Sequence, residues 1–343
     1  MRAVRFHEHG GPEVLKLEQL PVPEPGPGQV RVRVRAVALN HLDLWNRRGL
    51  PGRKVALPRI PGADVAGEVD QLGPGVAGIQ PGEKVIINPG MSCGRCEFCL
   101  TGRDNLCPHY DILGNRSDGG YAEFVVVPQA NVIPMPKNLD FPHAAAVPLV
   151  FLTAWHMLVT LAQVRPGETV LVWGAGSGVG SAGIQVAKLF GARVIATVGS
   201  EEKADRATRL GADVVINHRD KHVDEEVRAL TGRRGVDVVF EHVGQATWEK
   251  SIRSLAHGGR LVTCGATTGP EGLTDIRYVF ARQLKIFGSY MGSKGELLQL
   301  LPFVEKGQLK PVVDRVLPLE QAAEAHRIME QRRHFGKLVL GAA

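Results

Sequence analysis

Hydrophobic and polar residues alternate in short runs over the first third of the chain, and proline and glycine separate the runs. Within residues 29–39, the string VRVRVRAV places apolar residues at every second position, which is the period of a strand with one buried face. Similar runs occupy 63–73, 83–88 and 121–128, and the PG and GP pairs between them indicate turns. The pattern predicts a mainly β domain, a partly open barrel, over about the first 135 residues.

From about residue 165 the pattern changes to apolar strands that alternate with glycine turns and amphipathic helices. Buried strands alternating with helices form parallel sheets, so this half predicts a doubly wound sheet. The expected strands are 168–174, 193–198, 213–217, 236–243, 259–265 and 284–292, and the expected helices are 179–191, 201–210, 220–231 and 246–256.

The tail beyond residue 293 returns to helices and a strand at 336–341, and we expect it to complete the first domain. The predicted α/β chain therefore has a first domain at 1–149 and 290–343, which includes a lobe at about 90–110. A nucleotide-binding domain occupies 150–289.

An apolar stretch at 144–162 is long enough to span a bilayer. It contains proline, threonine and histidine, however, and runs directly into the nucleotide-binding pattern, so we interpret it as a buried helix at the domain junction. The chain starts without the apolar run of a signal peptide, which favours the cytoplasm. The net charge of +6 is modest, and Arg31, Arg33 and Arg35 are expected on a solvated strand face. No nucleic-acid module and no membrane partner are predicted.

Four of the five cysteines fall within fifteen residues, at Cys93, Cys96, Cys99 and Cys107. Their C-x2-C-x2-C-x7-C spacing suits a tetrahedral zinc site, and a closed shell of four thiolates leaves no position for water or substrate. Buried thiols and two disulfides are the alternatives, and the lack of a secretory signal disfavours the disulfides. We expect one structural zinc ion per chain.

A glycine-rich turn at 173–181 lies between the first strand of the predicted sheet and the helix that follows. Glycines there let the backbone approach a pyrophosphate, and the helix N-terminus receives its charge. The best fit to a dinucleotide fingerprint is Ala175-x-x-Gly178-x-Gly180. The predicted cofactor residues of this turn are Ala175, Gly176, Ser177, Gly178, Val179 and Gly180.

The second strand ends at Val198, without the carboxylate that would bind the adenosine ribose of NAD. Ser200, Lys203 and His218 could contact a 2′-phosphate, which favours NADPH while leaving NAD possible. Glu201 and Glu202 lie close by and argue against this preference. Ser200 also has a sufficient role as a helix N-cap.

The order of these features resembles the medium-chain dehydrogenase/reductase superfamily over essentially the whole chain. Further matches are 62–67 (GADVAG), 81–85 (PGEKV) and 119–123 (GGYAE). The resemblance implies a GroES-like catalytic domain, a Rossmann domain and a nicotinamide-dependent oxidoreductase, with the four cysteines as structural zinc ligands. Thr153 is then expected beside the nicotinamide, and the strand ends at Gly244, Gly265 and Ala266 are expected to line its pocket.

The catalytic zinc ligands of the family's alcohol dehydrogenases are missing. Their positions correspond to Asn40, Ala63 and Leu149, of which two have no ligand atom and Asn is a poor zinc ligand. An improvised site from His41, Asp43 and Asp64 is the remaining way to hold a metal.

The string 40–49 (NHLDLWNRRG) and the junction 148–155 resemble instead the quinone oxidoreductase and enone reductase branch, which works without catalytic zinc. Leu50 and Pro51 follow where that branch often has a tyrosine. Asn40 is the candidate hydrogen-bond donor to a carbonyl oxygen, and Asp43 would orient its loop. A plain turn residue is the alternative for Asn40.

The first hypothesis is an NADPH-dependent reductase of quinones, enones or aldehydes without catalytic metal. The second is an alcohol dehydrogenase with an unusual metal site or none, and the third is a dinucleotide-binding sensor or scaffold. The apolar strand at 284–292 lies where superfamily members pair, so a homodimer or homotetramer is expected. Cys264 is expected to pack as a small hydrophobic residue.

Overall fold

The computed structural model describes residues 1–49 and 56–342, so Leu50 and Pro51 lie outside the described residues. The chain divides into two compact units. The first comprises Met1–Leu149, Ser293–Gly307 and Pro311–Ala343, and the second comprises Val150–Gly292 with Gln308–Lys310.

The first unit is built on a mixed sheet with strand order β16-β17-β3-β4-β5-β9, to which β8 adds by pairing with β3. The β16–β17 pair is parallel, and the other pairs are antiparallel. The alternating pattern of β3 buries its valines, while the arginines on its other face pair with Glu24, Glu68 and Asp70. Two small sheets, β1-β2 and β6-β7, complete the unit. The strands are β1 (Arg2–Arg5), β2 (Lys16–Gln19), β3 (Gln29–Ala38), β4 (Asp64–Leu72), β5 (Lys84–Ile87), β6 (Gly90–Met91), β7 (Asp111–Ile112), β8 (Phe124–Pro128), β9 (Val132–Pro134), β16 (Val313–Pro318) and β17 (Lys337–Gly341).

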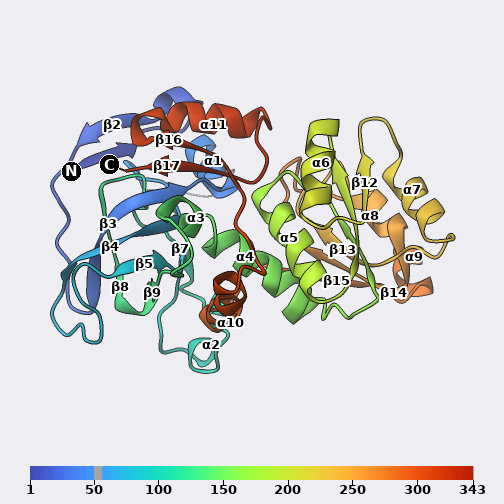
Figure 1. Cartoon of the computed structure of the whole chain (residues 1–343), viewed down its shortest axis with the longest axis horizontal. Helices are drawn as coiled ribbons and strands as arrows, with labels where there is room; N and C mark the ends of the chain where they lie inside the picture. The colour runs from blue at the N-terminus through green and yellow to red at the C-terminus, as the bar shows by residue number, and fades with distance from the viewer. Residues whose placement is uncertain (50–55, 343) are drawn as a thin grey trace. The chain divides into compact units, whose positions relative to one another are not determined.

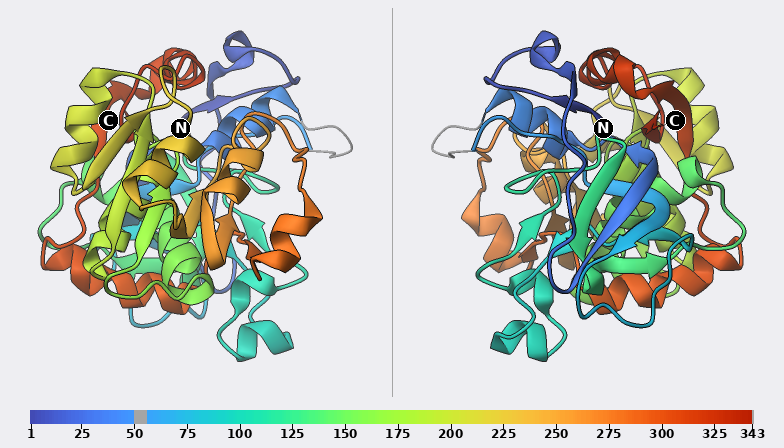
Figure 2. Two further views of the ribbon diagram at one scale, coloured as in Figure 1. Left: turned by 90° about the vertical axis from the view of Figure 1, so that its right-hand side faces the viewer. Right: turned by 90° about the vertical axis from the view of Figure 1, so that its left-hand side faces the viewer.

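Short helices connect these strands (Figure 1 and, from two further sides, Figure 2). The α-helices of the first unit are α1 (His41–Arg48), α2 (Glu97–Leu100), α3 (Phe141–Ala145), α10 (Lys294–Glu305) and α11 (Ala322–Glu330). The 3-10 turns are η1 (Pro12–Val14), η2 (Asp104–Leu106), η3 (Gln129–Asn131) and η5 (Leu319–Gln321).

The second unit holds a six-stranded parallel sheet in the order β12-β11-β10-β13-β14-β15. This order confirms the predicted doubly wound Rossmann sheet. Figure 1 shows α5 and α6 on one side of the sheet and α7 and α8 on the other. The strands are β10 (Thr169–Val172), β11 (Arg193–Val198), β12 (Val214–Asn217), β13 (Val236–Glu241), β14 (Leu255–Thr263) and β15 (Lys285–Gly288), and the helices are α5 (Gly178–Leu189), α6 (Glu201–Arg209), α7 (Val223–Leu230), α8 (Trp248–Ser254) and α9 (Ile276–Ala281).

The sequence suggested one buried helix over 144–162, but the structure divides this stretch. It contains the end of α3, then α4 (Pro148–Trp155), and then a π-helical turn, η4 (His156–Leu161). The break precedes Pro148, whose ring and missing N–H favour a helix start. None of the helices in the described part of the chain has the length and apolar character needed to cross a membrane.

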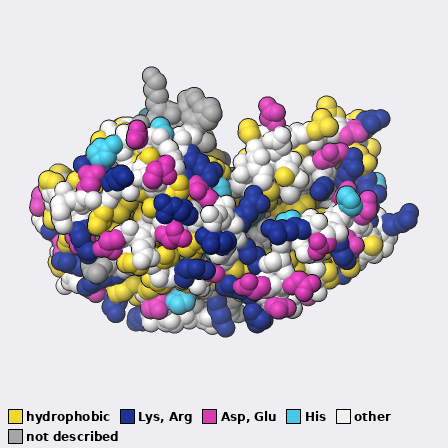
Figure 3. Space-filling model, turned by 90° about the horizontal axis from the view of Figure 1, so that it is seen from above, with side chains coloured by type: hydrophobic (Ala, Val, Ile, Leu, Met, Phe, Trp, Pro, Cys, Tyr) yellow, Lys and Arg dark blue, Asp and Glu magenta, His cyan; other side chains and the backbone are white. Residues whose placement is uncertain are grey.

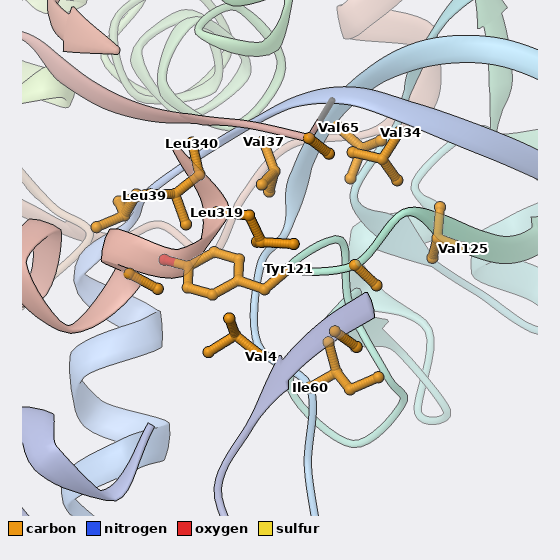
Figure 4. Packing of buried hydrophobic residues seen from close by; sticks show 14 of the residues in the cluster. Val4, Val34, Val37, Leu39, Ile60, Val65, Tyr121, Val125, Leu319 and Leu340 are labelled. Carbon is orange, nitrogen blue, oxygen red and sulfur yellow. The ribbon is translucent and has the colours of Figure 1, made fainter. Parts of the chain in front are cut away.

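Each unit has a core of its own. In the first, the ring of Tyr121 lies among Val4, Leu39, Leu319 and Leu340 (Figure 4). In the second, the buried faces of the parallel strands pack against the surrounding helices. Basic and acidic side chains are interspersed over the surface seen in Figure 3, in keeping with the modest net charge.

Candidate functional site

Asn40, Asp64 and Lys337 form a buried polar cluster in the first unit. Lys337 Nζ lies 2.5 Å from Asn40 Oδ1 and 2.9 Å from Asp64 Oδ2. Asn40 Nδ2 donates to the same Asp64 oxygen at 2.9 Å, and the other Asp64 oxygen accepts the Leu149 N–H at 2.8 Å. The strand order β17-β3-β4 brings the three residues together, because Lys337 begins β17, Asp64 begins β4 and Asn40 follows β3.

A catalytic zinc does not fit this cluster. The ammonium of Lys337 already binds the oxygens of Asn40 and Asp64, and its fixed positive charge would repel a second cation. Ala63 and Leu149 offer no ligand atom. Within residues 1–49 and 56–342, the four cysteines are the only group of three or more His, Cys, Asp or Glu side chains close enough to share a metal ion. The improvised site from His41, Asp43 and Asp64 is therefore not formed.

Asp43 fixes the loop that carries Asn40. Its carboxylate accepts the N–H of Asn40 at 2.8 Å and that of Gly62 at 3.0 Å, and the Tyr121 hydroxyl donates to it at 3.4 Å. Burial raises the pKa of Asp43 to about 6, against the lowering effect of the two backbone N–H groups. Only 1% of Asp43 is exposed. Asp43 therefore acts through its bond to the Asn40 backbone, which positions Asn40.

The Tyr121 ring explains why residue 62 is glycine. Gly62 has φ +105°, and a Cβ there would lie 2.4 Å from the Tyr121 ring. The Tyr121 hydroxyl lies 3.2 Å from His326 Nε2, and His326 Nδ1 lies 3.4 Å from the buried guanidinium of Arg47. Burial, together with the charge of Arg47, lowers the pKa of His326 to about 3, so its imidazole is neutral. This network of hydrogen bonds connects α1 to α11.

The four predicted zinc ligands meet at one point. The Sγ atoms of Cys93, Cys96, Cys99 and Cys107 all lie within 4.8 Å of one another, and the Cys93–Cys99 separation is 3.9 Å. Zinc–sulfur bonds of about 2.3 Å in a tetrahedron require sulfur atoms about 3.8 Å apart, so the four side chains fit zinc. Backbone N–H groups of Arg95 and Cys96 lower the pKa of the Cys93 thiol to about 6, which favours the thiolate that a metal requires.

The glycine turn is held in a form that only glycine permits. Gly174 has φ +58°, and a Cβ on Gly180 would lie 2.3 Å from the Gly174 carbonyl oxygen. Ser177 caps α5, and its Oγ accepts the Gly180 N–H at 2.9 Å. A Cβ on Gly183 would lie 3.0 Å from the Phe240 ring, so this third glycine allows α5 to approach the sheet closely. The sequence interpretation missed the role of Gly183.

Ala175, Gly176, Gly178 and Val179 belong to this turn and the first residues of α5. The N–H of Ala175 donates to the Thr197 carbonyl at 2.9 Å, which ties the turn to β11.

Two polar residues at the carboxyl end of β13 were also missed. The buried Glu241 carboxylate accepts the N–H groups of Val243 and Gly244 at 2.6 and 3.1 Å and the hydroxyls of Thr247 and Ser251 at 3.0 and 2.6 Å. It thereby fixes the turn between β13 and α8. The two consecutive polar residues, Glu241 and His242, at the end of an apolar strand were the available sequence signal.

His242 lies beside the glycine turn. Its Nε2 donates to the Trp173 carbonyl at 2.7 Å, and a Cβ on Gly174 would lie 3.1 Å from its ring. Burial lowers the pKa of His242, which keeps the imidazole neutral next to the turn.

The remaining predicted residues of the second unit lie at strand ends and in α4. Thr153 is buried in α4. Gly244 has φ +89°, and a Cβ there would lie 2.8 Å from Ala266 Cα, so the loops after β13 and β14 are in contact. A Cβ on Gly265 would lie 3.0 Å from the His242 carbonyl oxygen, so this glycine also allows a close approach of the two loops. Burial, with Glu241 nearby, raises the pKa of Cys264 to about 12, so its thiol stays protonated.

The end of β11 brings together the residues predicted to bind adenosine. Ser200 Oγ accepts the Lys203 N–H at 3.4 Å and caps α6. A Cβ on Gly199 would lie 3.3 Å from His218 Nε2 and 3.4 Å from Arg219 Nε. Arg219 is thus a fourth basic or hydroxyl group at this strand end, and the sequence interpretation did not include it.

Comparison with known proteins agrees with this architecture. Residues 26–137 match the model of the alcohol dehydrogenase GroES-like domain, and residues 178–306 match that of the zinc-binding dehydrogenase family. The quinone oxidoreductase of Rattus norvegicus is 35% identical, over 99% of this chain and 97% of that protein. The NAD-dependent alcohol dehydrogenase of Sulfolobus acidocaldarius is also 35% identical, over 99% of both.

Among solved structures, a crystal structure of an NAD-dependent alcohol dehydrogenase superposes with a TM-score of 0.97 at 57% identity, over the whole of both chains. The chain therefore belongs to the medium-chain dehydrogenase/reductase superfamily and is a nicotinamide-dependent oxidoreductase of that type. This confirms the predicted family and fold class.

Proposed function

We propose that the protein reduces a quinone, enone or aldehyde with NADPH and uses no catalytic metal. The observation that carries this proposal is the Asn40–Asp64–Lys337 cluster, in which an ammonium takes the oxygen contacts that a metal would need. One zinc ion, bound by the four cysteines, then has a structural role only.

Asn40 is the proposed donor to the substrate oxygen. One of its amide hydrogens is bonded to Asp64 at 2.9 Å, and the other makes only a long contact of 3.4 Å to the Ala38 carbonyl. This second hydrogen can be redirected at little cost. Lys337 binds the amide oxygen of Asn40, and this polarisation strengthens the amide as a donor.

Bound NADPH supplies the hydride. The chain then has to hold the substrate carbonyl in register and stabilise the charge that develops on its oxygen. Asn40 would provide that hydrogen bond, and Asp43 would hold its loop in place.

Metal content and turnover together test this proposal. We expect one zinc per chain and saturable consumption of NADPH with members of a panel of quinones, enones and aldehydes. The Asn40→Ala variant should lose kcat while still binding dinucleotide. Two zinc ions per chain, with activity lost when the less tightly held ion is chelated, would support the alcohol dehydrogenase alternative. If NADPH and NADH bind without any turnover, the sensor or scaffold alternative is favoured.

We infer a preference for NADPH over NADH from the end of β11. The His218 and Arg219 side chains lie at that position, and Ser200 caps the helix that begins there through the Lys203 N–H. No carboxylate follows Val198 directly. Guanidinium groups bind phosphate well. The Arg219→Ala variant should therefore bind NADPH less tightly and leave NADH binding unchanged, while Arg209→Ala on α6 serves as the control. A tenfold tighter binding of NADH than of NADPH by the native protein would contradict the inference.

We also propose a homodimer formed through β15. This strand lies at the open edge of its sheet, and Ile286 on it is 40% exposed. Ile276 and Phe280 are four residues apart on the preceding α9 and so share one helix face. They are 72% and 68% exposed, and exposed apolar side chains gathered on one face mark interaction surfaces. Light scattering should give the dimer mass, or the tetramer mass if a second interface exists. The Ile286→Lys/Phe280→Glu variant should be monomeric. The cytoplasmic location stays a prediction.

A further inference from the structure

A small arginine-lined cavity opens on the second unit, at the amino ends of β13 and β14. Its volume is about 220 Å³. It is lined by basic side chains and includes no carboxylate among its lining residues. These side chains are Arg228, Arg233, Arg234, Arg253, His257 and Arg282.

The cavity is remote from the dinucleotide turn. All strands of this sheet are parallel, and the glycine turn follows the carboxyl end of β10, at the level of Phe240 on β13. The cavity lies at the opposite end of β13, beside Gly235. The length of this strand puts about 16 Å between the two levels. The cavity is therefore a separate site.

Most of the positive charge in the cavity is not neutralised by the protein. Asp237 pairs with Arg234, and Glu249 pairs with Arg253. Within the part of the chain that the structure describes, Arg228 and Arg282 donate only to backbone carbonyls, those of Arg253 and Leu255, at 3.2 to 3.5 Å. Each guanidinium has five N–H donors, so most of the donors around the cavity are left for a ligand.

The Arg282 guanidinium and the backbone of the loop that carries Arg233 are held in place before any ligand binds. Arg282 lies over the Tyr278 ring at 4.4 Å. The loop that carries Arg233 is fixed by its own backbone, since the Arg233 N–H donates to the Arg228 carbonyl at 2.6 Å and Gly235 N–H donates to Thr231 Oγ1 at 2.9 Å. Burial and the neighbouring charge of Arg228 lower the pKa of Arg282, so like charges repel here and an anion would relieve the repulsion.

We propose that this arginine cavity binds a small phosphate-bearing anion with two or more negative charges. Guanidinium forks match phosphate oxygens in pairs. The cavity is smaller than the roughly 300–1,000 Å³ typical of organic-ligand pockets. It therefore suits pyrophosphate itself, or the phosphate groups of a metabolite whose remainder stays in solvent.

Calorimetric titration of the full-length protein with inorganic pyrophosphate tests this site. The protein is first saturated with dinucleotide, so that pyrophosphate cannot occupy the glycine turn. We expect one pyrophosphate per chain, with an affinity that falls as salt rises. The Arg233→Gln/Arg253→Gln variant should bind at least tenfold more weakly, and Arg209→Gln, an exposed arginine on α6 of the same unit, should bind like the native protein.

Parallel titrations identify the source of the phosphate. Tighter binding of a sugar bisphosphate than of pyrophosphate would indicate a phosphorylated metabolite, and the reverse order would indicate the free anion. The absence of binding at millimolar pyrophosphate would overturn the proposal, as would equal binding by both variants. A glutamate-rich peptide that binds as tightly as pyrophosphate would overturn the assignment to phosphate.

Discussion

Replacing Lys337 by methionine should destabilise the first unit strongly. The change removes the ammonium that lies 2.9 Å from Asp64 Oδ2 and leaves the carboxylate buried, since Asp64 is 0% exposed. Loss of one partner from a buried ion pair costs about 3–5 kcal/mol. Asp64 keeps the hydrogen bonds from Asn40 and Leu149, so we expect the lower end, about 3 kcal/mol. For a domain of this size, that lowers Tm by about 6–12 °C.

Thermal unfolding followed by circular dichroism measures the effect. Arg327→Gln is the matched control in the same unit, because its pair with Glu324 is about half exposed and such pairs contribute about 1 kcal/mol or less. The Asp64→Leu/Lys337→Met variant should regain part of the lost stability, since it leaves no buried charge alone. A loss below 1 kcal/mol in Lys337→Met, or a double variant as unstable as the sum of the singles, would refute the reasoning.

Three further predictions concern the other sites. Cys107→Ser should lower zinc, measured by mass spectrometry, to well below one ion per chain and lower Tm; unchanged zinc would contradict the assignment. Gly180→Ala should raise the dinucleotide Kd at least tenfold in a fluorescence titration, because the new Cβ would meet the Gly174 carbonyl at 2.3 Å, whereas Gly295→Ala should have no effect. The folded pKa of Asp43, about 6, exceeds its ordinary value of 3.8. Protonated Asp43 therefore stabilises the fold by about 3 kcal/mol relative to ionised Asp43. This contribution is fully present below about pH 4 and is lost as pH rises through 6. Subtracting the pH–stability curve of Asp43→Asn from that of the native protein should reveal this decline, and identical slopes between pH 4 and 7 would contradict it.

The sequence predicted best those features that depend on neighbouring residues. The spacing of the four cysteines, the alternation in β3 and the glycine turn are local patterns. They led to a cysteine cluster whose thiols do lie together, to the fold class and to the position of the turn. The family resemblance added the expectation that the metal ligands at Asn40, Ala63 and Leu149 are absent.

Features that depend on distant residues could not be predicted in this way. Lys337 is 273 positions from Asp64, and only the order β17-β3-β4 brings them together. A lysine at the start of an apolar strand gave a weak signal, because a solvated strand end would show the same pattern. Arg219 was missed for a similar reason, since its approach to Gly199 depends on the pairing of β11 with β12.

The insertion of the Rossmann unit into the first unit has a consequence for synthesis on the ribosome. Strand β17, which pairs with β3, leaves the exit tunnel after all strands of the Rossmann unit. Until then the Ala36–Ala38 end of β3 lacks its β17 partner and Asp64 lacks the Lys337 charge, whereas the second unit is almost complete by Gly292. Because domains fold as units during synthesis, the nascent Rossmann unit should fold first, and the unit that begins the chain should fold last.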